Sequence, residues 1–401
     1  MLPTPSELTA DALSDWIAKN PDPDVGGVRI LPDLKTVMVY WKGAPPAGLR
    51  NLAVTLPMPV TFQASPYSLA DLDPIARKVL ADNRDVVSST GPSHDYSGVS
   101  VTLWSTAPLN ATIARLNKEA SVPIIFDKTA DPVDLAGTTD TSDSHALDEC
   151  VEPARCADVP RFFGGGMIRV RGLTPSWSRV CSTGVALYAG THQYMTTAAH
   201  CLPSGTWVSY DNGEVLGSVN QSIGHYKPDP GDIMIIETPN LFRIWNGAWN
   251  TDISQPVTKM KRPAEGVYVA VSAGVSGNNA PQRVESVGRY WSTETAESVG
   301  PGFFVEPHVT DRIWGYVQKG DSGSPVIRSD SAGNFEVQGF LSKGQNTVAT
   351  PTNCSPLRHP GFPPTTSPPS YCYGDYWAVY ADIAINSYVG VHLKTVSDQG
   401  P

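Results

Sequence analysis

The spacing of apolar positions divides the chain into regions of different character. In residues 1–127, runs that alternate apolar and polar residues are separated by stretches with a helical apolar repeat. The first pattern is typical of strands and the second of amphipathic helices. Strands are predicted over 36–41, 60–64, 99–104 and 122–126, and helices over 46–56, 68–80 and 111–120. Ser68 is the expected N-cap of the second helix. Alternating strands and helices predict a small α/β N-terminal domain over 1–127.

Residues 128–160 carry few apolar residues and many acidic ones. Threonine, serine, glycine and proline surround Asp131, Asp134, Asp140, Asp143, Asp148 and Glu149. A segment of this composition has too little apolar surface to form a core of its own. It is therefore predicted to be an acidic flexible linker.

From residue 161 to residue 395 the pattern changes to short β-prone runs separated by glycine, proline, asparagine and aspartate. The runs are 167–170, 185–188, 194–197, 207–210, 233–236, 267–271, 303–305, 325–327, 337–341 and 377–380. Frequent short strands with turn signals between them are typical of an all-β barrel or sandwich. The proline-rich segment 355–370 is predicted to be an extended surface loop.

Composition and charge exclude some classes of function. The 401-residue chain has a net charge of −10 and no run rich in lysine or arginine. We expect no nucleic-acid partner, because nucleic-acid binding depends mainly on clustered basic residues. No apolar run approaches the roughly 18 residues of a membrane-spanning helix, so we expect no membrane partner. Residues 1–5 are not followed by the apolar core of a signal peptide, and no basic region is present there.

The six cysteines form an even set that falls into local pairs. The pairing predicted from their positions is Cys150–Cys156, Cys181–Cys201 and Cys354–Cys372. Other connectivities stay open, as does the alternative of six reduced thiols in a cytosolic protein. Disulfides indicate an oxidising compartment, so an extracellular, secreted protein is expected. No Cys-x-x-Cys or His-x-x-x-His spacing occurs, so no metal site is expected.

Three short segments carry the candidate chemistry. His200 ends the β-prone run 196–199, Asp232 precedes the apolar run 233–236, and Ser322 lies in the segment Gly-Asp-Ser-Gly. A serine hydroxyl becomes a nucleophile when an imidazole accepts its proton and a carboxylate orients that imidazole. We predict that His200, Asp232 and Ser322 are the catalytic residues. Asp229 and Asp211 are rivals for the carboxylate.

Backbone donors are expected beside the serine. Gly320 has no side chain in the way, so its N–H and that of Ser322 can converge on one point. Two such donors form an oxyanion hole for the tetrahedral intermediate. Asp321 is expected to hold this loop through an internal ion pair or hydrogen bonds.

The segments around these residues resemble the chymotrypsin-like serine proteases. The resemblance is strongest to the bacterial streptogrisin and α-lytic protease branch, in the blocks Cys181-Ser182-Thr183-Gly184 and Thr197-Ala198-Ala199-His200-Cys201. Residues 163–166 resemble the start of the mature domain in that branch. The resemblance implies a double six-stranded β-barrel over 161–395, with the three catalytic residues in the cleft between the barrels.

The resemblance also assigns substrate-binding positions. It places Ser342 beside the aspartate, and it implies that Lys343 and Gly344 pair with the substrate backbone as an added strand. Tyr316 occupies the position that usually sets the primary specificity pocket. Because this position is not acidic, cleavage after lysine or arginine is not expected. The loop 357–369 follows the substrate-pairing strand and is predicted to line the cleft.

Departures from the family pattern concern two residues near the serine. Ser324 stands where the family usually has a second glycine, and Gln318 replaces a cysteine that often precedes the serine block. A small serine should be tolerated, and the late disulfide must differ from the usual one.

The resemblance gives residues 1–127 a possible role as a pro-region. In this branch an α/β pro-region helps the barrels to fold and then blocks the cleft, so this region is a candidate intramolecular inhibitor and chaperone. The alternative is a permanently attached domain with a partner of its own. The mature chain is expected to start near Phe163.

The function predicted from the sequence is a secreted serine endopeptidase that acts on peptides or proteins and needs no cofactor. One alternative is a catalytically weak, protease-like binding protein in which Tyr316 closes the specificity pocket. Another is an esterase that uses the same residues.

Overall fold

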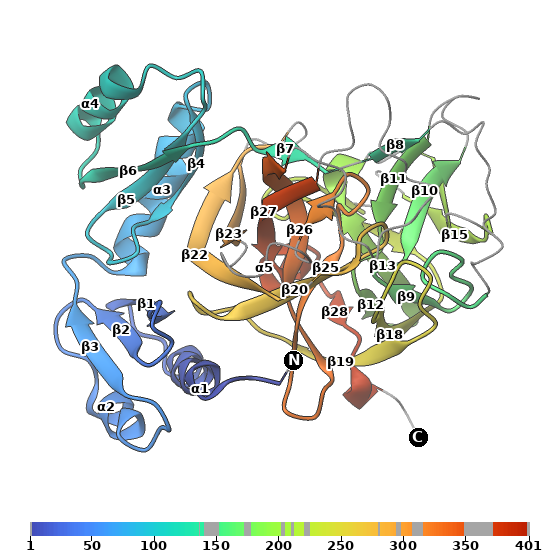
Figure 1. The fold of residues 1–401 in the computed structure, drawn as a ribbon, viewed down its shortest axis with the longest axis horizontal. Helices are drawn as coiled ribbons and strands as arrows, with labels where there is room; N and C mark the ends of the chain where they lie inside the picture. Colours follow the sequence, from blue (N-terminus) through green and yellow to red (C-terminus); the bar gives the residue numbers. More distant parts are fainter. Residues whose placement is uncertain are drawn as a thin grey trace.

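The structure is a computed structural model of the chain (Figure 1). It describes residues 2–135, 137–139, 152–171, 178–201, 205–209, 212–219, 225–279, 281–293, 298–306, 316–348 and 372–398.

The N-terminal region contains two successive units with the same order of elements. The first comprises α1 (Pro5–Lys19), β1 (Val25–Ile30), β2 (Val37–Trp41), α2 (Ala47–Ala53) and β3 (Val60–Ala64). The second comprises α3 (Leu69–Asp82), β4 (Val87–Pro92), β5 (Val99–Leu103), α4 (Leu109–Glu119) and β6 (Ile124–Thr129). In each unit the first two strands are antiparallel and the third is parallel to the second. The sequence predictions did not anticipate this repeat.

Capping boxes start the first helix of each unit. Ser68 accepts a hydrogen bond from the backbone N–H of Asp71, and the Asp71 carboxylate accepts one from the N–H of Ser68. Thr4 and Glu7 make the same reciprocal pair at the start of α1. Each box satisfies two N–H groups that the helix itself leaves without partners.

Most strands of the first half of the β region form two sheets. Its elements are β9 (Phe162–Gly164), β10 (Met167–Arg171), β11 (Ser178–Ser182), β12 (Ala186–Ala189), β13 (His192–Ala198), the 3₁₀ turn η1 (Ala199–Cys201), β14 (Thr206–Ser209), β15 (Val215–Ser218), β16 (Tyr226–Lys227), β17 (Ile233–Glu237) and β18 (Asn240–Trp245). One sheet has the order β15-β14-β10-β11-β8, where β8 is Gly137–Thr139. The other has the order β16-β17-β13-β12-β28, where β28 is His392–Leu393. Strands β9 and β18 pair with each other and belong to the large sheet of the second half.

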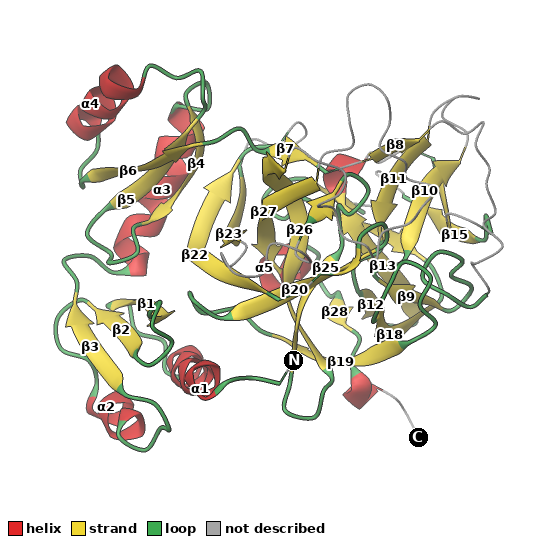
Figure 2. Ribbon diagram, in the orientation of Figure 1, coloured by secondary structure: helices red, strands yellow, loops and turns green. Residues whose placement is uncertain are grey.

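The second half of the β region forms one large sheet. Its elements are β19 (Ser254–Met260), β20 (Tyr268–Ala273), β21 (Gly277–Asn278), β22 (Gln282–Trp291), β23 (Val299–Glu306), β24 (Val317–Gln318), β25 (Pro325–Ser329), β26 (Phe335–Val348), β27 (Cys372–Tyr380), α5 (Ala381–Asn386) and the 3₁₀ turn η4 (Val396–Asp398). The strand order β21-β20-β25-β26-β27-β23-β22 continues into β4-β5-β6 of the N-terminal region. Figure 2 shows strands throughout this part and most helices in the N-terminal region. The prediction of an all-β region preceded by a small α/β region is confirmed.

The N-terminal region joins the β region through sheet extension. Ser89 and Thr90 of β4 pair with Trp291 and Tyr290 of β22. The buried guanidinium of Arg289 donates hydrogen bonds to Ser89 at 2.8 Å and to Thr102 at 3.0 Å. The sheet therefore continues from one region into the other, and buried polar side chains form hydrogen bonds across the junction.

Charged side chains make a second contact between the two regions. Arg328 of β25 donates to Asp11 of α1 at 2.9 Å, and both side chains are largely buried. Glu265 lies 2.6 Å from Arg29 of β1 and 2.8 Å from His94. The two arginine–carboxylate pairs are largely buried. Dissolved salt therefore screens them less than it screens ion pairs on the surface.

Part of the segment predicted to be a linker is packed into the β region. Arg155 is fully buried, and its guanidinium donates to the carbonyl of Ala273 at 2.6 Å and to Ser272 at 2.9 Å. Asp158 accepts hydrogen bonds from the N–H of Phe163 at 2.9 Å and from Trp245 at 3.1 Å. Burial raises the pKa of Asp158 to about 7. Residues 152–160 are thus held by specific polar contacts.

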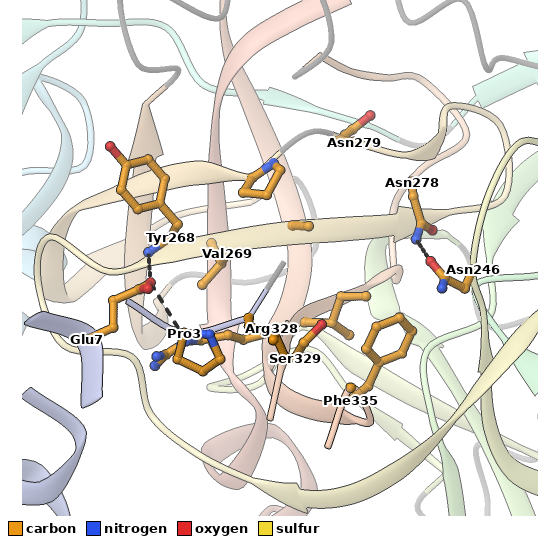
Figure 3. A pocket seen from close by; sticks show the side chains of 15 residues that line it. Pro3, Glu7, Asn246, Tyr268, Val269, Asn278, Asn279, Arg328, Ser329 and Phe335 are labelled. Atoms are coloured by element: carbon orange, nitrogen blue, oxygen red, sulfur yellow. Dashed lines mark hydrogen bonds and ion pairs between the residues drawn. The ribbon is translucent and has the colours of Figure 1, made fainter. Parts of the chain in front are cut away.

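A cavity of about 410 Å³ lies between the chain start and the second half of the β region (Figure 3). Glu7 faces it and accepts a hydrogen bond from the N–H of Tyr268 at 3.0 Å. Its lining also includes Pro3, Asn278 and Phe335, and it shares no residue with the candidate site described below. In the part of the chain that the structure describes, no helix is long and apolar enough to cross a membrane.

Candidate active site

His200, Asp232 and Ser322 come together although they lie far apart in the chain. His200 is in the 3₁₀ turn that ends β13, Asp232 directly precedes β17, and Ser322 lies in the turn before β25. All three are buried, with relative exposures of 1%, 2% and 0%. The pairing of β13 with β17, which places Ala198 opposite Ile233, brings the histidine and the aspartate to the same end of two neighbouring strands.

The three side chains form a continuous hydrogen-bonded chain. His200 Nδ1 lies 2.8 Å from Asp232 Oδ2, and His200 Nε2 lies 2.6 Å from Ser322 Oγ. A carboxylate can only accept, so Nδ1 carries the imidazole proton and donates to Asp232. Nε2 is then free to accept the proton of the serine hydroxyl. This is the arrangement in which an imidazole can act as a general base toward a serine.

Several backbone contacts fix the aspartate. The N–H of His200 donates to Asp232 Oδ1 at 3.1 Å, and the N–H of Ala199 donates to the Asp232 carbonyl at 3.0 Å. Asp232 has a φ of 44°, in the left-handed region that side chains rarely adopt. Backbone strain of this kind persists only where surrounding contacts hold it. The rival Asp229 instead accepts from the N–H of Ser298 at 3.2 Å, and the rival Asp211 lies outside the described residues.

Ser342 lies against the same carboxylate. Its hydroxyl donates to Asp232 Oδ2 at 2.5 Å and accepts from the indole N–H of Trp291 at 3.3 Å. The structure thus puts Ser342 beside the aspartate, where the resemblance placed it. With His200, the hydroxyl supplies a second side-chain donor to Asp232 Oδ2.

The turn that carries Ser322 depends on two glycines. Gly320 and Gly323 have φ values of 98° and 85°, which glycine adopts without steric cost. A Cβ on Gly323 would lie 2.6 Å from the backbone nitrogen of Ala198, so no side chain fits there. The N–H of Ser182 donates to the Ser322 carbonyl at 2.9 Å. Ser324 is also fully buried in this turn.

Asp321 holds the turn from inside. Its carboxylate accepts from the N–H groups of Val275 at 3.2 Å, Ser276 at 3.0 Å and Gln318 at 2.8 Å, and from the Ser276 hydroxyl. Burial raises the pKa of Asp321 to about 6, and these hydrogen bonds oppose that effect. Hydrogen bonds therefore fix the loop, one of the two means expected from the sequence. Gln318 contributes through its backbone.

A disulfide joins Cys181 to Cys201, with 6.4 Å between their Cα atoms. It ties β11 to the turn that carries His200. Cys156 and Cys372 are also disulfide-bonded, but their predicted partners, Cys150 and Cys354, lie outside the described residues. The predicted cleft loop 357–369 lies outside them as well.

A segment of the chain itself runs past the candidate site. In β7 (Val133–Asp134), Val133 pairs with Gly344 and Asp134 pairs with Lys343, antiparallel to β26. The next described strand, β8, pairs antiparallel with β11, where Gly137 lies opposite Val180. The segment is therefore held as an added strand on both sides of Leu135. Lys343 and Gly344 take part in strand addition, and the added strand here comes from the chain itself.

Leu135 lies at the centre of this segment. Its carbonyl oxygen accepts a hydrogen bond from the N–H of Gly320 at 2.5 Å. Its side chain is fully buried, in the same apolar cluster as Val317 and Tyr373. A Cβ placed on Gly344 would lie 2.8 Å from Leu135 Cδ2, so the glycine makes room for the leucine. Sequence reasoning missed Leu135; the one available signal was an apolar residue inside an acidic segment.

Tyr316, His192 and His225 make their described contacts with other residues. Tyr316 is 4% exposed and packs against Cys372, in a cluster separate from the one that holds Leu135. His192 pairs with Glu237 at 2.7 Å. His225 contacts the ring of Tyr194. Among the described residues, no group of histidine, cysteine, aspartate and glutamate could hold a metal ion.

Comparisons with known proteins give structural matches alone. No protein-family model and no curated protein matches the chain. Thermobifida fusca protease A is 15% identical with a TM-score of 0.38, over 58% of this chain and 98% of that one. A Nocardiopsis protease is 16% identical with a TM-score of 0.38, over 58% and 98%. A glutamic acid specific serine protease is 18% identical with a TM-score of 0.39, over 58% and 99%. These similar structures are bacterial serine proteases, the kind of protein that the sequence resembles. Their TM-scores are too low to add weight, so we base the proposed function on the geometry of the site.

Proposed function

We propose that the protein is a serine endopeptidase that hydrolyses peptide bonds through an acyl-enzyme. The observation that carries this proposal is the hydrogen-bonded chain from Asp232 through His200 to Ser322. Ser322 Oγ attacks the carbonyl carbon of the scissile bond while His200 Nε2 takes the hydroxyl proton. His200 then gives that proton to the leaving amine, and Asp232 holds the imidazole in the required tautomer.

The backbone of the serine turn completes the machinery. The N–H groups of Gly320 and Ser322 are proposed to stabilise the tetrahedral oxyanion. The N–H of Gly320 already donates to a peptide carbonyl, that of Leu135. A donor of this kind is typically worth about 10²–10³ in rate. Each of these steps uses only side chains and backbone groups of the chain itself.

Peptides and proteins are the proposed substrates. β26 accepts an antiparallel peptide strand at Lys343 and Gly344, which is how an extended peptide is recognised through its main chain. The esterase alternative does not account for this strand addition. A closed pocket behind Tyr316 is not favoured either, since a leucine side chain is buried beside Gly344.

The N-terminal region is proposed to act as an intramolecular inhibitor, since residues 133–134 and 137–139 that follow it pair with β26 and β11 beside the serine turn. Secretion is proposed on the basis of the disulfide between Cys181 and Cys201.

Labelling with a fluorophosphonate probe tests the proposed function. Wild-type protein separated from its N-terminal region and from the inhibitory segment should form a covalent adduct at Ser322, located by mass spectrometry of the tryptic peptide, and should hydrolyse peptides. Ser322→Ala should do neither. Ser324→Ala is the matched control, because Ser324 lies in the same buried turn and outside the proposed proton path. The absence of both labelling and peptide hydrolysis in the wild-type protein would refute the proposal.

A further inference from the structure

The described residues 133–135 and 137–139 run beside the candidate site as an extended substrate would. Strand pairs hold it on both sides of Leu135, with β26 before this residue and β11 after it. An inhibitory segment that merely covers a cleft needs no particular register. This one places a single carbonyl, that of Leu135, on the N–H of Gly320.

The register puts one peptide carbonyl, that of Leu135, against the turn that carries Ser322. Gly320 stands two residues before Ser322 in a turn that is closed by the contact of the Ser182 N–H with the Ser322 carbonyl. A peptide carbonyl polarised by a backbone N–H beside a serine is the carbonyl that the serine attacks. That carbonyl belongs to Leu135, and Ala136 follows it in the sequence.

The burial of the leucine side chain adds a second, independent observation. Leu135 is 0% exposed, although the segment around it is acidic and poor in apolar residues. The Cδ2 atom approaches Gly344 so closely that even a methyl group there would collide. The space beside Gly344 is therefore an apolar pocket filled by a branched aliphatic side chain.

We propose that the protein cuts its own chain after Leu135 and that this pocket selects leucine in other substrates. The inference rests on the proposed endopeptidase function and adds to it the self-cleavage site and the preferred residue. It places the start of the mature chain at Ala136, earlier than the start near Phe163 that the resemblance implied.

The step balances without any co-reactant other than water. Ser322 Oγ forms a bond to the carbonyl carbon of Leu135, and the hydroxyl proton passes to His200. The bond from that carbon to the nitrogen of Ala136 breaks as His200 gives this nitrogen the proton, which leaves a free amine. Water then gives a proton to His200 and its oxygen to the acyl carbon. The bond from that carbon to Ser322 Oγ breaks as His200 returns the proton to Oγ. The products are the carboxylate of Leu135 and a regenerated Ser322.

The first test follows cleavage in the full chain. Incubated wild-type protein should yield a fragment whose N-terminal sequencing begins at Ala136, and Ser322→Ala should stay intact by mass. Leu135→Asp should slow cleavage at this bond by about 10²-fold, because a charged side chain would enter an apolar pocket. Leu109→Asp is the matched control; it makes the same change at an exposed leucine of the N-terminal region and should be cut as fast as wild type.

The second test uses peptides and does not depend on the folding of Leu135→Asp. A peptide of residues 131–140 should be cut after its leucine. The same peptide with aspartate or lysine in place of the leucine should be cut about 10²-fold less efficiently. Equal efficiency for the three peptides would overturn the inference, as would a mature N-terminus away from Ala136 in a protein that labels with fluorophosphonate. Loss of labelling and of all peptide hydrolysis would instead refute the proposed function.

Discussion

The β region and the N-terminal region contribute different things to the candidate site. Every side chain of the proton path comes from the β region, and each is fixed there by contacts within that region. The rest of the chain contributes the strand that pairs with β26 at Lys343 and Gly344, and it contacts the β region through paired strands and ion pairs. The catalytic side chains and the segment that pairs beside them therefore lie on separate elements. Mutations should be able to change catalysis without changing the docking of the N-terminal region, and the reverse.

Ser322→Ala has the largest expected effect, because it should abolish catalysis and leave the docking of the N-terminal region unchanged. Ser322→Ala should lower kcat for peptide hydrolysis by about 10⁶-fold, because the nucleophile is lost. The change removes one buried oxygen and no contact between the regions. The melting temperature of the intact chain, measured by calorimetry, should therefore stay close to that of uncut wild type. A large drop in melting temperature would contradict the separation.

Replacing the orienting carboxylate should have the next largest effect. Asp232→Asn should lower kcat by about 10⁴-fold, because the amide favours the wrong imidazole tautomer. Kinetics on a leucine peptide measure this change. Asp229→Asn is the control and should retain wild-type kcat, since Asp229 bonds to the N–H of Ser298. Equal losses of kcat in the two variants would contradict the assignment of Asp232 as the carboxylate that orients His200.

Breaking a buried ion pair should weaken the docking of the N-terminal region onto the β region and leave catalysis unchanged. Arg328→Met leaves the carboxylate of Asp11 buried without one of its cations, at a cost of about 3 kcal/mol in the free energy of docking. Calorimetry should show an earlier transition for the N-terminal region. The kcat of the processed enzyme should not change. Arg262→Met is the control; its pair with Asp382 is about half exposed and should cost about 0–1 kcal/mol.

The smallest expected effect is a pH dependence of docking. The hydrogen bond to Glu265 raises the pKa of His94, with Arg29 and Glu285 as its other charged neighbours. A raised pKa means that the contribution of His94 to docking is complete below about pH 6.5 and is lost as pH rises through the higher value. The cut N-terminal fragment should therefore co-elute with the β region more at pH 6 than at pH 8 in gel filtration.

His94→Gln should flatten that pH dependence. His192→Gln is the control, because His192 pairs with Glu237 inside the β region and should leave the dependence unchanged. If co-elution in His94→Gln depends on pH as steeply as in wild type, His94 does not cause the pH dependence of docking.

Local signals made the proton path predictable from the sequence. His200 ends a β-prone run, Asp232 precedes one, and Ser322 lies in the segment Gly-Asp-Ser-Gly; their chain order and flanking residues are distinctive. The predicted strands over 36–41 and 60–64 and the N-cap at Ser68 also depend on neighbours in sequence. Such features are set within a few residues, so they can be recognised without the fold.

Features that depend on distant contacts were missed. The strand β4, Val87–Pro92, buries three consecutive polar residues, 88–90; within it Thr90 donates to the carbonyl of Ala76 and Ser89 accepts from Arg289. No alternation of apolar and polar residues could reveal such a strand. Leu135 is one of the few apolar residues of the acidic segment, and its partner Gly320 lies in another part of the chain. In contrast, the start of α1 had a local signal, since Thr4 and Glu7 are spaced as a capping box.

The continuation of the large sheet from β22 into β4 has a consequence for the processed protein. If the N-terminal fragment departs, the N–H and C=O groups of Tyr290 and Trp291 that it paired become a bare sheet edge, which can template another strand. The fragment therefore protects an edge strand that would otherwise promote association. A fragment released by one molecule could pair, through β4, with the exposed β22 edge of another molecule.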